Sequence, residues 1–289
     1  MEQIIRWLLE DKNPEIQYRT MLELLEMKKD DTEVRDVKNT LLSSEVFDKV
    51  YQKLKMGKKW ETYNVLSAFA EFGLTREDIG IELDGYVNAL IEETEFQMMC
   101  GEALLLRNLI LLGYGDEPRV REEVSHVFEK QKPDGGYGCL SKKPKINLAK
   151  GCYRQTGTYL LLAAALKKKG YAMPQQEKEL VNYYLNREVL YANHDHNAFV
   201  VPDLAGTFYP LDPVKIGLQM AMYSLSVLGY GADERCKKAW TVLDSKRDGD
   251  GHYILDKALS KPVYKIGKVG NPNKWVTLYA LLAKKDISY

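Results

Sequence analysis

Residues 101–137 read GEALLLRNLILLGYGDEPRVREEVSHVFEKQKPDGGY, and residues 217–253 read GLQMAMYSLSVLGYGADERCKKAWTVLDSKRDGDGHY. The two stretches align without a gap, position 101 with 217 and position 137 with 253. Leu112-Gly113-Tyr114-Gly115 matches Leu228-Gly229-Tyr230-Gly231, and Asp134-Gly135 matches Asp250-Gly251. A gap-free match over a whole unit predicts an internal repeat.

Each copy of this unit is predicted to be a helical hairpin. The first half, Ala103 to Leu112, is apolar on nearly all sides, which is typical of a buried helix. Gly113 suits the left-handed residue that follows a helix, and Asp134-Gly135-Gly136 predicts a tight turn. Between them the apolar residues recur at helical spacing among charges, as in a half-exposed helix: Val120, Val124, Val127 and Phe128.

The composition limits the class of protein. The chain has 289 residues, with 41 Lys+Arg and 41 Asp+Glu, and this zero net charge argues against a general nucleic-acid binder. Residues 1–10 lack the pattern of a signal peptide, and no apolar run reaches the length of a membrane span. The four cysteines do not indicate a disulfide framework in a chain this long. We therefore expect a cytoplasmic protein with reduced thiols.

Apolar and amphipathic helices alternate along the chain, and strand patterns are almost absent, so the predicted class is all-α. Apolar segments end at Gly73, Gly113, Gly170 and Gly229 and near Lys284, and each but the last precedes an amphipathic segment. This alternation predicts an α/α toroid, a closed ring with the apolar helices inside. An open α-solenoid is the alternative. We expect one domain over 1–289, in which an N-terminal helical segment, 1–56, packs on a toroid core, 57–289.

The loop after each outer helix resembles the QW-type repeat of the terpenoid cyclase and protein prenyltransferase superfamily. Gln131-Lys132-Pro133-Asp134-Gly135-Gly136-Tyr137 carries the resemblance, with Tyr in place of Trp, and residues 248–253 are a degenerate copy. The resemblance covers about residues 60–284 and implies a toroid that holds an isoprenoid-like ligand. The family's Asp-x-Asp-Asp, Asp-Asp-x-x-Asp and Asp-x-Cys motifs are absent from this sequence. The resemblance therefore supports a fold more strongly than a reaction.

In such a ring the N-termini of the inner helices and the Gly-rich loops share one rim, where we expect the site. Cys100, Cys139, Cys152 and His194 are the candidate zinc ligands, because three thiolates and an imidazole suit tetrahedral zinc. Buried free thiols are the alternative for these cysteines, and packing is the expected role of Cys236. His194, His196 and Asp203, from a long loop over 191–213, are candidate acid–base residues, with a solvated polar loop as the alternative.

The ring centre is predicted to be an apolar cavity with a polar mouth, floored by residues such as Leu106. Its tyrosines would stabilise a cation or stack on a sugar, although core packing is the ordinary role of tyrosine. Arg154 follows a lysine-rich loop that would hold an anionic head group, with a solvated loop as the alternative. The candidate ligand-binding residues are Tyr137, Arg154, Tyr159, Tyr223, His252, Tyr253, Trp275 and Tyr279.

Three functions fit these patterns. The first is a prenyltransferase-like or terpenoid-cyclase-like protein that binds an isoprenoid-like ligand, with catalysis left open. The second is a non-catalytic ring that binds a lipid, a peptide or a protein. The third is a carbohydrate-active α/α barrel, either a lyase or a hydrolase. The expected partner is an apolar small molecule or peptide in the central cavity, and the sequence does not indicate an oligomeric state.

Overall fold

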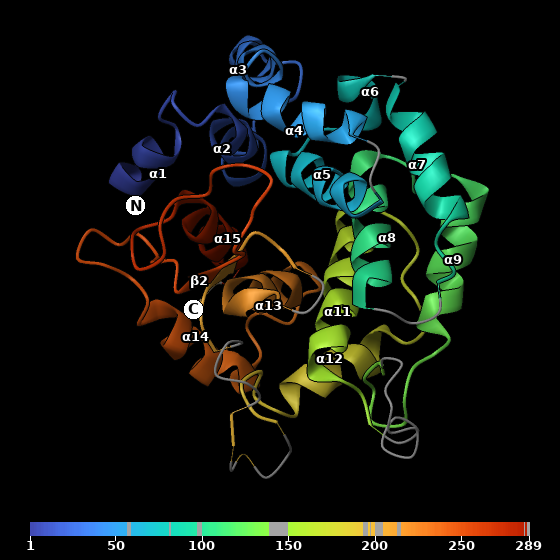
Figure 1. Cartoon of the computed structure of the whole chain (residues 1–289). Coiled ribbons are helices and arrows are strands. Elements are labelled where there is room, and N and C mark those ends of the chain that lie inside the picture. Colours follow the sequence, from blue (N-terminus) through green and yellow to red (C-terminus); the bar gives the residue numbers. More distant parts are fainter. Residues whose placement is uncertain are drawn as a thin grey trace.

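The computed structural model describes residues 1–56, 59–80, 82–96, 100–138, 150–192, 196, 198, 199, 205–212, 215–285 and 287, with the backbone alone for residues 60 and 100. Helices make up most of this part of the chain (Figure 1), which confirms the predicted all-α class. Two short strands, β1 (Phe208–Tyr209) and β2 (Lys257–Ala258), pair in parallel. None of the described helices combines the length and the apolar character that a membrane crossing requires.

An inner set of helices lies nearest the middle of the molecule (Figure 1). These helices are buried on most sides, and in α11 every residue from Gln155 to Leu166 is buried. Hydrophobic burial on all sides explains their nearly continuous apolar sequences. The inner set comprises α2 (Pro14–Arg19) with its continuation η1 (Thr20–Leu24), α5 (Lys59–Phe72), α8 (Cys100–Leu112), α11 (Tyr153–Lys168), α13 (Gly217–Val227) and α15 (Lys274–Lys284).

An outer set of helices lies around the periphery and buries one face of each longer member (Figure 1). In α9, for example, Val120, Val127 and Phe128 are buried while charged residues occupy the other face. The outer set comprises α1 (Glu2–Leu8), α3 (Thr32–Leu42), α4 (Glu45–Lys55), α6 (Arg76–Ile79), α7 (Glu82–Glu92), α9 (Pro118–Phe128), α12 (Glu177–Leu185), η2 (Glu234–Cys236) and α14 (Lys237–Asp244).

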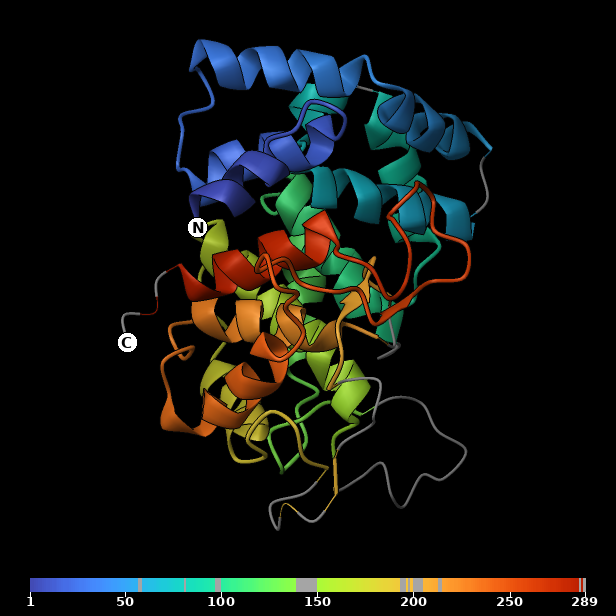
Figure 2. The same cartoon turned by 90° about the vertical axis from the view of Figure 1, so that its left-hand side faces the viewer.

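The inner helices contact one another in chain order. Helix α5 packs against α8, α8 against α11, α11 against α13, and α13 against α15. Helix α15 then contacts η1 and α2, and α2 in turn contacts α5. Figure 2 shows the same neighbourhood from the side, with the blue N-terminal helices next to the red α15. The first part of the chain thus lies between the last inner helix and α5.

Asn13-Pro14, with proline at the first helical position, predicts a single helix from Glu15 to Met27, and here the structure differs. Helix α2 ends at Arg19 and continues as the π-helical segment η1. The wider turn is visible in the hydrogen bond from the Leu25 N–H to the Thr20 carbonyl, at 3.0 Å. π-Helical turns are rare and occur often at functional sites. Arg19, the last residue of α2, and Glu23, in η1, both belong to the site described below.

The two repeated stretches adopt the same local geometry where their first helices end. Gly113 has a φ of 93° and Gly229 a φ of 94°, in the left-handed region that glycine tolerates. The residue after each glycine donates its N–H back to the helix, Tyr114 to Leu109 at 2.9 Å and Tyr230 to Leu225 at 2.8 Å. Each glycine thus lets the chain reverse direction into the outer helix.

The loop at the end of each repeated stretch docks an aromatic residue on the next inner helix. The Tyr137 N–H donates to the Thr156 hydroxyl of α11 at 2.9 Å, and the Tyr253 N–H donates to the Thr277 hydroxyl of α15, also at 2.9 Å. Both aromatic rings are buried. Tyr137 and Tyr253 therefore join one helical hairpin to the next.

Candidate functional site

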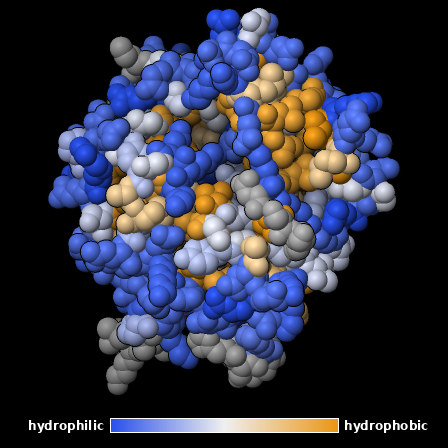
Figure 3. Space-filling model, turned by 180° about the vertical axis from the view of Figure 1, so that it is seen from behind, coloured by the Kyte–Doolittle hydropathy of each residue, from blue (hydrophilic) through white to orange (hydrophobic). Residues whose placement is uncertain are grey.

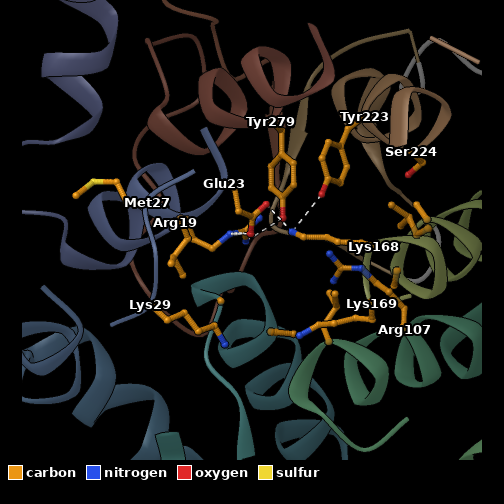
Figure 4. Close-up of a pocket in the computed structure, with 17 residues that line it drawn as sticks. Arg19, Glu23, Met27, Lys29, Arg107, Lys168, Lys169, Tyr223, Ser224 and Tyr279 are labelled. Carbon is orange, nitrogen blue, oxygen red and sulfur yellow. Dashed lines mark hydrogen bonds and ion pairs between the residues drawn. The ribbon is translucent and has the colours of Figure 1, made fainter. Parts of the chain in front are cut away.

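A cavity of about 300 Å³ lies among the C-terminal halves of the inner helices (Figure 4). Viewed from behind, the molecule is hollowed near its centre (Figure 3). The cavity, called the central pocket below, is lined by apolar and by polar side chains. The apolar lining is Leu22, Met27, Ala70, Leu111, Leu161, Ala164 and Ala165, and the polar lining is Arg19, Glu23, Lys29, Arg107, Lys168, Lys169, Tyr223, Ser224 and Tyr279.

The location of the central pocket differs from the prediction. We expected the site at the N-termini of the inner helices, but Arg107, Leu111 and Lys168 lie in the later turns of α8 and α11. The carbonyl groups at helix C-termini carry partial negative charge, which suits Lys168 and Lys169 at the end of α11. The lining is apolar over most of its area, as predicted, but it also carries several charged side chains that the prediction did not include.

Arg107, in the pocket lining, forms an ion pair with Glu71, which lies behind it. Arg107 Nη2 is 2.7 Å from Glu71 Oε1, and the two side chains are only 4% and 1% exposed. Burial disfavours the charge of Arg107, but the carboxylate of Glu71 outweighs it and raises the arginine's pKa. The Tyr279 hydroxyl donates to the other oxygen of Glu71 at 2.5 Å. Both charges of the buried Glu71–Arg107 pair therefore have a partner, as buried charges require.

Glu23 lies between two cations on the opposite side of the pocket (Figure 4). Its Oε1 is 2.5 Å from Arg19 Nε, and its Oε2 is 2.5 Å from Lys168 Nζ. Burial opposes ionisation of Glu23, but Arg19 and Lys168 outweigh it and lower the pKa of Glu23 to about 2. Glu23 is consequently a carboxylate at any ordinary pH.

Lys168, Lys169 and Lys29 line the same pocket. Burial lowers the pKa of Lys169, and the positive charges of Lys29 and Lys168 lower it further. The pKa of Lys168 is also lowered, by burial and by repulsion from Arg19, and Glu23 opposes these effects. The Lys168 side chain keeps 31% of its surface exposed because it faces the open pocket.

Cations outnumber carboxylates at this site. Arg19, Lys29, Arg107, Lys168 and Lys169 line the pocket, whereas the carboxylates described there are Glu23 in the lining and Glu71 behind Arg107. No hydrogen bond or ion pair of the Lys29 or Lys169 ammonium group is seen with the described part of the chain. The pocket is therefore positively charged, with apolar walls beside the charges.

Tyr223 and Tyr279 are the predicted ligand-binding residues that line the central pocket. Lys168 Nζ lies 3.4 Å from the Tyr223 hydroxyl, and Arg19 packs over the face of Tyr279 with its guanidinium carbon 5.4 Å from the ring centre. The polar edges of these two tyrosines thus contact the charged cluster. The Tyr223 hydroxyl accepts from Lys168 and can donate its own proton to an anionic ligand, whereas the Tyr279 hydroxyl already donates to Glu71.

Tyr137, Tyr159 and Tyr253 were predicted to bind ligand, and the structure places them elsewhere. The rings of Tyr137 and Tyr159 stack with their centres 3.7 Å apart, and both are essentially buried between α9 and α11. Tyr253 is equally buried, and its hydroxyl donates to Asp244 at 2.8 Å. None of the three lines the central pocket, so their role is packing between helical hairpins. Leu106, the predicted floor, is buried and also absent from the lining.

The other predicted ligand-binding residues, Arg154, His252 and Trp275, also lie outside the central pocket. Arg154 lies in the first turn of α11, half-buried. The His252 ring packs on Trp7, with ring centres 4.1 Å apart, and its Nδ1 is 3.2 Å from Asp248. Trp275 lies in the first turn of α15 and lines a separate cavity of about 620 Å³, between the α1–α2 region and the loop before α15.

The predicted acid–base residues and zinc ligands fall mainly outside the described residues. His194, Asp203, Cys139 and the side chain of Cys100 all lie there. His196 is described, and its Nε2 is 3.2 Å from the Asn186 carbonyl while its Nδ1 is 3.3 Å from Glu188.

Two cysteines are described, and both are free. Cys152 is a half-buried residue at the start of α11, and Cys236 is buried, as expected for packing. Burial raises the pKa of the Cys236 thiol to about 12. Zinc at Cys100, Cys139, Cys152 and His194 stays a prediction.

A second group of potential metal ligands occurs in the loop after α14. Asp248, Asp250 and His252 bring one ligand atom each within 4.8 Å of one another. Asp248 Oδ1 accepts hydrogen bonds from the N–H groups of Asp250 and His252, at 3.0 and 2.8 Å. These bonds are those of a tight turn and account for the proximity of the three side chains without an ion.

No protein-family model, curated protein or solved structure matches this sequence. The site therefore has to be interpreted from its own geometry. Sequence reasoning missed its charged residues, although a signal was present. Glu71 lies in the apolar last turns of α5 and Arg107 follows a run of apolar residues in α8, and a buried charge requires a partner.

Proposed function

We propose that this chain is an α/α toroid whose central pocket binds a small anionic molecule with an apolar portion. The ring would be closed by α2 and η1, which contact both α5 and α15. The excess of cations over carboxylates in the pocket is the observation that carries the binding proposal.

Three lysines of the central pocket favour an anionic ligand. Lys29, Lys168 and Lys169 repel one another, and this repulsion contributes to the lowered pKa of Lys169. An anion in the pocket relieves that repulsion and gains charge-assisted hydrogen bonds from ammonium groups. A neutral or cationic ligand of the same shape gains neither. The charge of the pocket thus selects the sign of the ligand.

The volume and the apolar lining of the central pocket restrict the uncharged part of the ligand. A volume of about 300 Å³ is at the lower end of the roughly 300–1,000 Å³ found for ligand sites. Leu22, Leu111 and Leu161 provide apolar surface beside the cations. A short hydrocarbon chain with one anionic head group fits both features, and a long isoprenoid chain fits the volume poorly.

The test is isothermal titration calorimetry with four probes that share a six-carbon chain. Hexyl phosphate and hexanoate carry the anionic group, whereas 1-hexanol and hexyltrimethylammonium do not. We expect saturable binding of at least one anionic probe and weaker or no binding of the other two. Lys168→Gln should weaken anion binding by about 10- to 100-fold, because a charge-assisted hydrogen bond is worth about 1.5–3 kcal/mol. Lys167→Gln, a change at an exposed neighbour outside the pocket lining, is the matched control. Equal binding of the anionic and the cationic probe would refute the proposal.

A second candidate function is an enzyme of the terpenoid-cyclase or prenyltransferase type that uses a short prenyl diphosphate. The rings of Tyr223 and Tyr279 beside the pocket favour it, because aromatic faces stabilise carbocations. Lys168 and Arg19 would hold the diphosphate. Release of inorganic diphosphate from geranyl diphosphate, with and without Mg²⁺, tests this function. Binding without release would leave a binding protein.

A further inference from the structure

The Glu23 carboxylate already occupies a position in the central pocket that suits a ligand anion. It uses both oxygens, one toward Arg19 Nε and one toward Lys168 Nζ, each at 2.5 Å. Its side chain is only 16% exposed, and Figure 4 shows it between these two cations, next to Tyr279. A carboxylate or a phosphate group from outside would bridge the same two cations in the same manner.

The backbone that carries Glu23 is anchored independently of its carboxylate. Lys285 donates to the Glu23 carbonyl at 2.8 Å and forms an ion pair with Glu26 at 2.6 Å. Glu26 itself has a φ of 54°, a left-handed conformation that residues other than glycine seldom adopt. The end of η1 is thus held against the end of α15, and the side chain of Glu23 can rotate without unfolding the segment.

The other deep cation of the pocket is less available to a ligand. Arg107 is held by Glu71 at 2.7 Å and donates to Asn108 at 3.0 Å, with 4% of its side chain exposed. A ligand anion at Arg107 would have to compete with the buried Glu71 carboxylate. Arg19 is as buried as Arg107, with 4% of its side chain exposed, but Lys168 beside it is 31% exposed and faces the pocket. The Arg19–Lys168 bridge is therefore the position at which a ligand anion gains most.

We infer that the ligand's anionic group displaces the Glu23 carboxylate and binds between Arg19 and Lys168. This inference rests on the proposed function, and it assigns the ligand class as a carboxylate or a phosphate monoester with a short apolar chain. The displaced Glu23 side chain turns toward Lys169, whose charge it already influences. Glu23 thus acts as an internal competitor that sets a threshold for ligand binding and keeps the cations paired when the pocket holds no ligand.

The experiment compares wild-type protein with Glu23→Gln, using hexyl phosphate and hexanoate by calorimetry at pH 7. Removal of the competing carboxylate should tighten binding of the preferred probe at least about tenfold, since like charges in one site strongly oppose each other. The better of the two probes identifies the head group. Glu10→Gln removes a carboxylate that pairs with Lys274, outside the lining of the central pocket, and should leave binding unchanged.

Glu23→Asp provides a second variant in case Glu23→Gln does not fold. The shorter side chain keeps its charge but cannot bridge both cations, so binding should be tighter than in wild type and weaker than in Glu23→Gln. If wild type binds the probe and the folded Glu23 variants bind it equally well or more weakly, the displacement is refuted and the proposed function still stands. Absence of binding by wild type and by the Glu23 variants overturns both.

Discussion

Arg107 and Glu71 form an ion pair of 2.7 Å at the centre of the molecule, although each lies in a mainly apolar part of its helix. The pair joins α8 to α5, and Glu71 also accepts a hydrogen bond from Tyr279 of α15. The Arg19 side chain donates to the Glu71 carbonyl as well, which brings α2 to the same point. Four inner helices thus meet at one carboxylate-bearing residue.

Loss of either partner of this pair should destabilise the fold strongly. Arg107→Gln and Glu71→Gln each leave one buried charge unpaired, so the free energy of unfolding should fall by about 3–5 kcal/mol. Urea denaturation measures the change. Arg119→Gln, at an exposed i,i+4 pair with Glu123, should cost less than about 1 kcal/mol.

The double substitution Arg107→Gln/Glu71→Gln tests whether the cost of each single substitution comes from the charge that it leaves unpaired. Because both charges are removed together, its cost should be well below the sum of the two single costs. Additive costs would show that the two side chains do not interact in solution.

The stability of the protein should depend on Glu23 at acid pH. The folded-state pKa of Glu23 is lowered from 4.5 to about 2, so its contribution is fully present above pH 4.5 and is lost as the pH falls through about 2. Wild type should therefore lose stability relative to Glu23→Gln between pH 4.5 and pH 2. The measurement is the difference between their free energies of unfolding at several pH values. A difference that stays constant over this range would contradict the ion-pair geometry.

Tyr137 and Tyr223 should separate stability from binding. Tyr137 is fully buried and stacked on Tyr159, so Tyr137→Ala should lower the free energy of unfolding by about 3–5 kcal/mol. Tyr223 lines the pocket beside Lys168, so Tyr223→Phe should weaken hexyl phosphate binding several-fold with less than about 1.5 kcal/mol lost in stability. Urea denaturation and calorimetry on both variants give the comparison. Tighter anion binding by Tyr223→Phe would remove Tyr223 from the site.

The helical elements of this fold were predictable from local patterns. Apolar runs such as Ala103 to Leu112 and the glycines at 113 and 229 fix where the inner helices lie along the chain and where they end. The end of α2 at Arg19 and the π-helical segment that follows it, both within residues 15–27, were not predictable in this way. The π-helical segment contacts α15, from the far end of the chain, and no local pattern contains such contacts.

The candidate site was predictable only in part. Tyr223 and Tyr279 were recognised as residues that face the centre, because they lie in apolar helices. Tyr137 and Tyr159 have the same residue type but pack on each other, and the sequence does not distinguish the two environments. The partners of Glu71 and Arg107 depend on how four helices are rotated about their axes. Such rotations follow from packing of the whole core rather than from spacing within one helix.

Gly135, in the loop after α9, should be less replaceable than Gly229, which lies just after α13. Both have positive φ, 82° at Gly135 and 94° at Gly229, so alanine costs about 1–2 kcal/mol of backbone strain at either position. A Cβ at Gly135 would also lie 2.3 Å from the Glu179 carbonyl oxygen, whereas a Cβ at Gly229 meets nothing within 4 Å. Gly135→Ala must therefore push α12 away from the loop that docks Tyr137. We expect Gly135→Ala to lower the free energy of unfolding by at least about 1 kcal/mol more than Gly229→Ala, because forced overpacking typically costs about 1–3 kcal/mol. Equal losses for the two variants in urea denaturation would contradict the contact between the Gly135 loop and α12.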